Sequence, residues 1–267
     1  MRAYEHTNSV VSLTLIGLTL YFVLEFPADD IAISLFGTPL GLSSPRRWLM
    51  ALLLVGFAMA GTDMVIRDQA VLARQRLSYL ATYWMLPGLL VALATQILGM
   101  APTPLAWAGG LLGVGVVLWV TIVAETQQIL SSTYTYRWVY LWRQFVGYAA
   151  ALAFFILIYQ SRARSAVSAS EVLLVSSMIT LALLRQDPNT ISRVWLFAAV
   201  IGLSMGQITW ALNYWRASTL NVGLLLLLIF YVLVGLAQQQ LLGTLSRRTL
   251  WEFGSIALIA MVVILNL

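Results

Sequence analysis

The chain has 267 residues, 61% of them hydrophobic and 9% charged, with a formal net charge of +5. It contains no cysteine and no lysine, and its one histidine is His6. This composition excludes disulfides, cysteine-ligated metal centres, bis-histidine haem and lysine nucleophiles, so we expect neither a cofactor nor a metal site.

Apolar runs long enough to cross a bilayer recur along the whole chain. The hydrocarbon core is about 30 Å thick, which a helix crosses with roughly 20 apolar residues. The sequence therefore predicts an all-α integral membrane protein, a polytopic bundle of about nine transmembrane helices forming one domain over residues 1–267. The expected spans are residues 9–26, 48–66, 78–100, 105–125, 138–159, 166–185, 193–215, 219–240 and 249–266.

The first apolar run follows Met1 and Arg2 as in a signal peptide, but no small-residue cleavage site follows it, so we expect a retained span. Residues 27–46 then form the one long loop, with two short apolar stretches on either side of Gly37-Thr38-Pro39. This pattern predicts a short hairpin or re-entrant loop on the outer surface. It would cap the helix ends or, alternatively, serve as a lid or partner-docking element.

The arginine distribution predicts the orientation in the membrane. With nine spans and a cytoplasmic N-terminus, ten arginines lie inside and five outside, as the positive-inside rule favours. Without the sixth span, whose apolar core from Val172 to Leu184 is short, the split becomes seven against eight. Ser168 and Glu171 also fit a capping box at the start of this span. We predict a bacterial cytoplasmic membrane protein with its N-terminus inside and its C-terminus outside.

Small residues at four-residue spacing mark helix faces that can approach a neighbour closely. Gly109 and Gly113 form one such face, and Ala198, Gly202 and Gly206 form another. Packing inside the bundle is the simplest role for them, and a homo-oligomer or a protein partner held through these faces is the alternative. Membrane lipids complete the expected partners, and nucleic acid is not among them.

Charged residues near the spans need partners, because a charge inside the bilayer costs roughly 2.5–3.5 kcal/mol on insertion scales. Asp63 lies four residues before Arg67, and Arg248 lies four residues before Glu252, so each pair can neutralise itself on one helix face. Glu125 differs from them because no arginine lies three or four positions away.

Several polar residues fall at the predicted cytoplasmic ends of their spans. If these helices adjoin, they form a vestibule for a polar solute or a lipid-linked headgroup, with arginine forks on phosphate. The other interpretation is a set of separate, solvated helix ends. The residues of the candidate vestibule are Asp63, Arg67, Glu125, Gln128, Arg143, Gln239, Arg248 and Glu252.

Pro87 interrupts the third apolar run. It has no N–H for the carbonyl of Tyr83, so we expect a helix kink. Interrupted helices often line transporter sites, although proline also occurs in ordinary membrane helices.

No catalytic motif is recognisable in the sequence, whether nucleophile elbow, phosphate-binding loop or paired His–Glu motif. The leading interpretation is a non-enzymatic accessory, scaffold or assembly component of a membrane. The alternative is a transport or lipid-handling protein that uses the vestibule. A third interpretation is an intramembrane transferase acting on a lipid-linked substrate, with Asp63 or Glu125 as the base.

Overall fold

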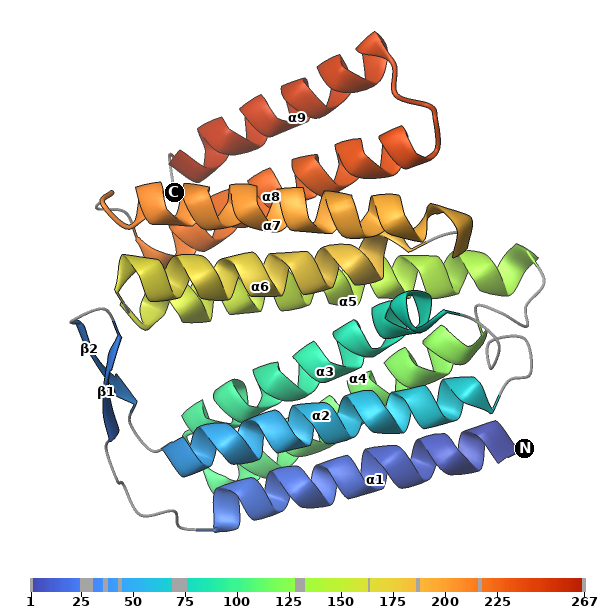
Figure 1. The fold of residues 1–267 in the computed structure, drawn as a ribbon, viewed down its shortest axis with the longest axis vertical. Helices are drawn as coiled ribbons and strands as arrows, with labels where there is room; N and C mark the ends of the chain where they lie inside the picture. The colour runs from blue at the N-terminus through green and yellow to red at the C-terminus, as the bar shows by residue number, and fades with distance from the viewer. Residues whose placement is uncertain are drawn as a thin grey trace. The chain divides into compact units, whose positions relative to one another are not determined.

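The computed structural model describes residues 2–24, 31–35, 38–42, 45–68, 76–127, 133–162, 164–185, 188–215 and 218–265. Helices dominate these ranges (Figure 1). The α-helices found there are α1 (Arg2–Val23), α2 (Pro45–Arg67), α3 (Leu77–Ile97), α4 (Pro104–Gln127), α5 (Thr133–Gln160), α6 (Ser165–Leu184), α7 (Ile191–Leu212), α8 (Thr219–Leu241) and α9 (Arg247–Leu265). Two 3-10 turns follow α3 and α6, at Leu98–Met100 and Pro188–Thr190.

Each expected span corresponds to one of these helices. Within the described ranges, α1 to α8 are long and apolar enough to cross a membrane, and α9 contributes a shorter apolar stretch, Leu250–Ile264. A helix suits this solvent because it satisfies its own backbone hydrogen bonds, which hydrocarbon cannot do. The prediction of an all-α, multi-pass membrane protein is confirmed.

A β-hairpin occupies the long loop between α1 and α2. Strand β1 (Ile31–Leu35) pairs antiparallel with β2 (Thr38–Leu42), with Ile31 opposite Leu42 and Leu35 opposite Thr38. Pro39 lies within β2, which is compatible with pairing because both strands of a two-stranded sheet are edges. The predicted hairpin is confirmed.

The backbone groups into two compact units, which we describe separately. Unit 1 comprises Met1–Arg74 and Pro87–Leu130, and unit 2 comprises Gln75–Leu86 and Ser131–Leu267. Helix α3 continues through Pro87 and contributes residues 77–86 to unit 2 and residues 87–97 to unit 1. The single domain over residues 1–267 remains a prediction.

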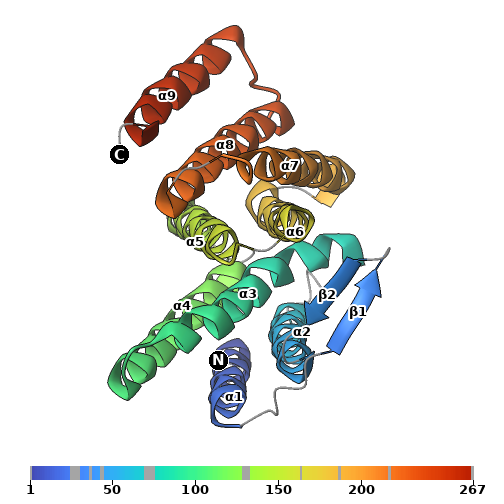
Figure 2. The same cartoon turned by 90° about the vertical axis from the view of Figure 1, so that its left-hand side faces the viewer.

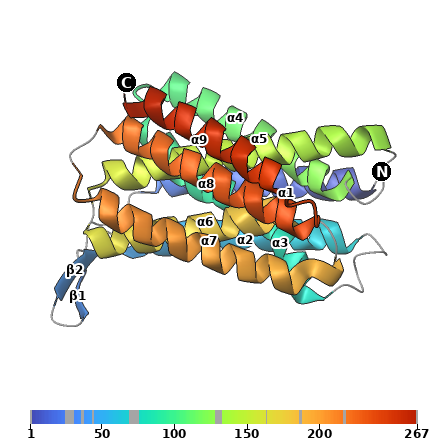
Figure 3. The same cartoon turned by 90° about the horizontal axis from the view of Figure 1, so that it is seen from above.

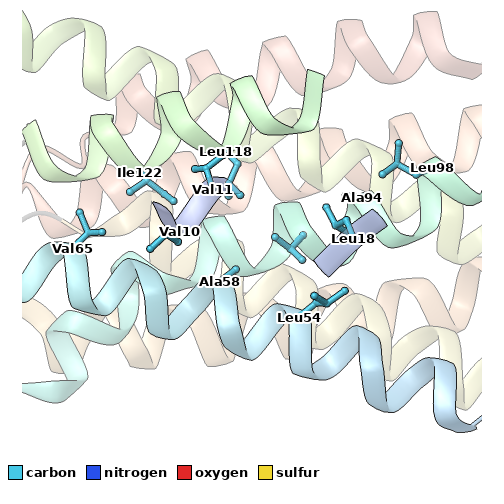
Figure 4. Close-up of a cluster of buried hydrophobic side chains, with 11 residues drawn as sticks. Val10, Val11, Leu18, Leu54, Ala58, Val65, Ala94, Leu98, Leu118 and Ile122 are labelled. Carbon is cyan, nitrogen blue, oxygen red and sulfur yellow. The ribbon is translucent and has the colours of Figure 1, made fainter. Parts of the chain in front are cut away.

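Unit 1 is held together by apolar side chains of α1, α2, α4 and the second half of α3 (Figure 4). Leu18, Ala58 and Leu118, from three of these helices, are completely buried. A polar contact adds to this packing, because Trp119 Nε1 of α4 donates to Asn8 Oδ1 of α1 at 2.7 Å.

Unit 2 is built on the four helices α5 to α8. Figure 2 shows α6 beside both α5 and α7, with α8 closing the group. Helix α9 packs along α8 (Figure 3), where Gly235 of α8 leaves room for the ring of Phe253. The start of α3 also belongs to this unit, since Trp195 Nε1 of α7 donates to the Ser78 carbonyl at 3.1 Å.

Helices α6 and α7 approach each other through glycine. A Cβ on Gly202 would lie 2.8 Å from the Leu173 carbonyl oxygen, and one on Gly206 would lie 3.0 Å from the Ala169 carbonyl oxygen. The α7 small-residue face is therefore a packing face inside unit 2. The α4 face differs, because Gly109 and Gly113 are exposed and no described atom lies within 4 Å of where their Cβ would be.

The predicted capping box at the start of α6 is wrong. The helix begins at Ser165, one turn before Ser168, with Arg164 at the N-cap and no side-chain capping bond. The Ser168 hydroxyl is buried and accepts a 2.7 Å hydrogen bond from Asn213 Nδ2 of α7. It therefore joins two helices instead of capping one.

Replacing Gly202 with alanine should destabilise the protein by about 1–3 kcal/mol, because a methyl group meets a backbone carbonyl that cannot rotate away. The matched control, Gly109→Ala, has open space and should be neutral or stabilising by up to about 1 kcal/mol. Unfolding of both variants in detergent, followed by tryptophan fluorescence, checks this difference. Equal stability of the two variants would contradict the close α6–α7 contact.

Candidate functional site

The residues of the candidate vestibule fall in both units. Asp63 and Arg67 on α2 and Glu125 on α4 belong to unit 1. Gln128 lies outside the described residues. The remaining four belong to unit 2 and are Arg143 on α5, Gln239 on α8, and Arg248 and Glu252 on α9. One vestibule that joins all eight residues remains a prediction.

Two pairs of these residues neutralise themselves on their own helices. Arg67 Nε donates to both carboxylate oxygens of Asp63, at 2.7 and 2.9 Å. Arg248 Nε lies 3.0 Å from Glu252 Oε1, with most of both side chains exposed. Exposed pairs at this spacing contribute about 0.3–0.5 kcal/mol, so these two pairs keep charges local and add little to stability.

Gln239 is half-buried near the end of α8. Its side-chain Oε1 accepts a hydrogen bond from Thr244 Oγ1 at 2.6 Å, and its carbonyl accepts one from the Thr244 backbone N–H at 3.0 Å. These contacts close the turn that leaves α8.

Glu125 and Arg143 are buried, unlike the exposed Arg248–Glu252 pair. Glu125 is 2% exposed and Arg143 is 3% exposed. The interpretation of separate, solvated helix ends therefore does not describe these two residues. Moving a charged group out of water costs several kcal/mol, so the surroundings of these two side chains must offset that desolvation cost.

Arg185 is the largest fully buried side chain of the described residues, at 1% exposure. It is the C-cap of α6, where the negative end of the helix dipole favours a cation. Its Cζ lies 3.5 Å from the centre of the Tyr83 ring, a close cation–π contact worth about 2 kcal/mol when desolvated. Tyr83 in turn donates its hydroxyl hydrogen to Tyr79 Oη at 3.2 Å.

Arg143 and Arg185 flank one contact between helices. Gly147 of α5 packs against Leu183 of α6, and the Leu183 carbonyl accepts a 3.4 Å hydrogen bond from Gln238 Nε2 of α8. Arg143 lies one turn before Gly147, and Arg185 lies two residues after Leu183. The two arginines are thus attached to α5 and α6 close in sequence to the place where these helices meet α8.

Arg143, like Arg185, has a tyrosine ring near its guanidinium group, in this case that of Tyr140. The Cζ of Arg143 lies 5.7 Å from the Tyr140 ring centre, and Gln144 Nε2 donates to the Tyr140 hydroxyl at 2.9 Å. The surroundings of both arginines therefore combine aromatic faces with hydroxyl and amide groups, a chemistry suited to a charged group out of water.

Further arginines lie at the same end of unit 2, where α3, α5, α7 and α9 begin and α6 and α8 end (Figure 1). All of them except the two buried ones are exposed. We call this set the arginine-rich end; it consists of Arg76, Arg137, Arg143, Arg185, Arg193, Arg247 and Arg248.

The charge of the sequence is distributed unequally between the units. Unit 2 contains ten arginines and three acidic residues, a formal charge of +7. Unit 1 contains five arginines and seven acidic residues, a formal charge of −2. Unit 2 therefore carries all of the chain's net positive charge, and most of its arginines belong to the arginine-rich end.

This donor set suits anions and does not suit metal ions. Guanidinium groups present planar, paired N–H donors that match carboxylate and phosphate oxygens. Within the described ranges, no three His, Cys, Asp or Glu side chains group closely enough to hold a metal ion.

Substitutions on α2 test the Asp63–Arg67 pair. Arg67→Ala should lower stability more than Asp63→Asn does, because it leaves a carboxylate without its cation in a poorly hydrated layer. Asp63 is partly exposed, so the loss should stay well below the roughly 3–5 kcal/mol seen for fully buried pairs. Thermal unfolding of both variants in detergent gives the order, and the reverse order would contradict this role for Arg67.

Comparison with known proteins gives one match. No curated protein and no solved structure matches the chain. The family described as "Protein of unknown function (DUF5656)" matches residues 26–267, which include all of unit 2 and the arginine-rich end. Because this match covers most of the chain, the protein belongs to the DUF5656 family.

Proposed function

We propose that the protein binds an anionic ligand at the arginine-rich end and acts in transport or lipid handling. The burial of Arg143 and Arg185 carries this proposal. The positive-inside rule requires arginines in loops on one side of the membrane, and the exposed members of the set satisfy it. The positive-inside rule does not explain why two further arginines, Arg143 and Arg185, are buried.

Burial of these arginines is costly and needs a purpose. Charged residues inside membrane proteins mark substrate paths or binding sites more often than they stabilise a fold. The Tyr83 ring lies against the guanidinium group of Arg185, and the Tyr140 ring lies near that of Arg143. The exposed arginines around them raise the local concentration of anions by long-range attraction. In this proposal the exposed arginines attract the anion, and the buried Arg143 and Arg185 bind it.

The orientation supports a cytoplasmic source for the ligand. The ten-to-five arginine split favours an N-terminus inside and a C-terminus outside, as proposed here for a bacterial cytoplasmic membrane. In this orientation the arginine-rich end faces the cytoplasm.

An accessory or scaffold role is the second candidate, and helix α9 favours it. Its half-buried and buried side chains form one narrow seam of Phe253, Ala257, Ala260 and Ile264. Other apolar side chains of α9, such as Leu258 at 66%, are largely exposed. Such a helix could pack against a partner as readily as against lipid.

A transferase is the third candidate. Its base would be Asp63 or Glu125, and Arg67 Nε donates to both carboxylate oxygens of Asp63.

Cysteine labelling tests the orientation. The chain has no native cysteine, so Ser165→Cys and Thr190→Cys introduce single probes at the start of α6 and in the turn between α6 and α7. In right-side-out cells, a membrane-impermeant maleimide should label the Ser165→Cys variant from outside and reach the Thr190→Cys variant only after lysis. Labelling of both from the same side would remove α6 as a span, and the opposite assignment would invert the topology.

Lipid retention tests the proposed function. Native mass spectrometry of the purified full chain, incubated with equal amounts of phosphatidylcholine and phosphatidylglycerol, should show preferential retention of the anionic lipid. Arg185→Gln should reduce this preference roughly tenfold, because a charge-assisted hydrogen bond is worth about 1.5–3 kcal/mol. Arg248→Gln is the matched control, since Arg248 is exposed and paired with Glu252.

Equal retention by wild type and Arg185→Gln would contradict anion binding and leave the accessory role. If Arg185→Gln does not fold, Arg143→Gln provides the second variant for the same comparison.

A further inference from the structure

We infer that the β-hairpin between α1 and α2 is a membrane-surface anchor. One of its faces lies against the boundary between lipid headgroups and acyl chains, so the partner of this face is lipid. The hairpin belongs to unit 1 and has no part in the anion binding proposed for the arginine-rich end.

The pairing of β1 with β2 separates large apolar residues from small ones. Cross-strand partners lie on the same face of a sheet, and successive residues of a strand alternate between its faces. One face, which we call the apolar face, carries five Ile or Leu residues and a threonine, in the pairs Ile31–Leu42, Ile33–Leu40 and Leu35–Thr38. The other, the small-residue face, carries the pairs Ala32–Gly41 and Ser34–Pro39. The hairpin is therefore amphipathic.

The apolar face needs a surface to cover it. Within the described ranges, β1 and β2 make extensive contacts only with each other. A single two-stranded hairpin is at best marginally stable in water, because it has no core of its own. A surface outside the hairpin must therefore take the apolar face out of water.

The bilayer is the apolar surface nearest to the hairpin along the chain. Strand β2 ends at Leu42 and α2 begins at Pro45, so three Cα–Cα steps, at most about 11 Å, separate the hairpin from a span. The headgroup region is about 5–8 Å thick on each side of the hydrocarbon core. Leu49 and Leu52, in the first two turns of α2, are already largely exposed. The lipid-facing surface of α2 thus begins close to the root of the hairpin.

The direction of the strands fits a position along the membrane surface. Both strands run across the direction of α1 and α2 (Figures 1 and 2). A deeper position is unfavourable, because both strands are edges whose outer N–H and C=O groups need water or headgroups. Amphipathic helices at this depth bury their apolar face about 5–10 Å into the boundary between headgroups and acyl chains. The same depth suits the hairpin and favours a surface anchor over a re-entrant loop.

The residues that border the hairpin favour lipid over a second protein chain. Pro39 lies in β2, and a proline on an edge strand hinders the addition of another strand. Arg47 and Trp48, at the start of α2, are exposed. Tryptophan prefers headgroup depth, and arginine attracts the phosphates of anionic lipids.

Spin labels on the full chain, in nanodiscs of phosphatidylcholine and phosphatidylglycerol, test the environment of each face. The chain has no native cysteine, so Ile33→Cys and Ser34→Cys place single nitroxides at adjacent positions on opposite faces. Oxygen concentrates in hydrocarbon, whereas a water-soluble nickel chelate stays outside it. The label at position 33 should collide with oxygen and be protected from nickel, and the label at position 34 should show the reverse. Leu40→Cys and Gly41→Cys should repeat this difference on β2.

A substitution on the apolar face gives a second test. In the Ile33→Cys background, Leu40→Ser changes the cross-strand partner of the labelled residue. It should raise the nickel collision rate of the label about threefold or more, because apolar area holds the hairpin in the bilayer. Ala32→Ser, on the small-residue face, is the matched control and should leave the rate unchanged. Tryptophan fluorescence confirms that each variant is folded.

The two reagents separate lipid from the other possible surroundings of the apolar face. Frequent collisions with oxygen and few with nickel at positions 33 and 40 alone support the anchor. Few collisions with either reagent at these positions would show that protein covers the face, which overturns lipid as the partner. Frequent nickel collisions on both faces would place the hairpin in water, and frequent oxygen collisions on both would make it re-entrant. Either of these results also overturns the surface anchor.

Discussion

Hydrocarbon offers neither hydrogen bonds nor hydration, and this constraint shapes both units of the protein. The backbone forms helices, because a helix pairs its own N–H and C=O groups and needs no hydrogen bonds from the solvent. The β-hairpin formed by β1 and β2 lies in the loop between α1 and α2, between apolar runs and not within one. Close packing must replace the hydrophobic effect between helices, because lipid is as apolar as leucine. Gly202 and Gly206 supply it where α6 meets α7, with backbone carbonyls near van der Waals distance.

The same constraint divides the charges into two kinds. Asp63 with Arg67 and Arg248 with Glu252 cancel within one helix turn, so they need nothing from the rest of the fold. Arg185 lies at the negative end of its own helix α6, and the Tyr83 ring that it contacts comes from α3, a helix distant in sequence. A charge held by distant elements ties those elements together. It also keeps a planar donor in one orientation, which a flexible surface arginine does not do.

The spans and the hairpin could be predicted because they depend on local composition: the length of an apolar run, and two short apolar stretches on either side of a turn. The self-paired charges could be predicted for the same reason, since helix geometry sets the i,i+4 contact. Arg185 could not, because the sequence shows it only as an arginine at the end of an apolar run, and its contact with Tyr83 depends on tertiary packing. Gly109 and Gly202 illustrate the same limit. Both lie in four-residue patterns of small residues, yet only Gly202 meets a neighbouring helix, since the pattern does not encode the partner's surface.

Pro87 lies in α3 at the boundary between the two units. A proline has no N–H to offer the carbonyl of Tyr83, so α3 is weakest in the turn that separates its two halves. The division between the two units falls at this residue. The half before it is anchored in unit 2 by the Trp195–Ser78 hydrogen bond and by the contact of Arg185 with Tyr83. The half after it packs in the apolar core of unit 1 through Val91 and Ala94. A helix with a missing hydrogen bond at its midpoint can serve two separate packing environments, because neither half depends fully on the other for its direction.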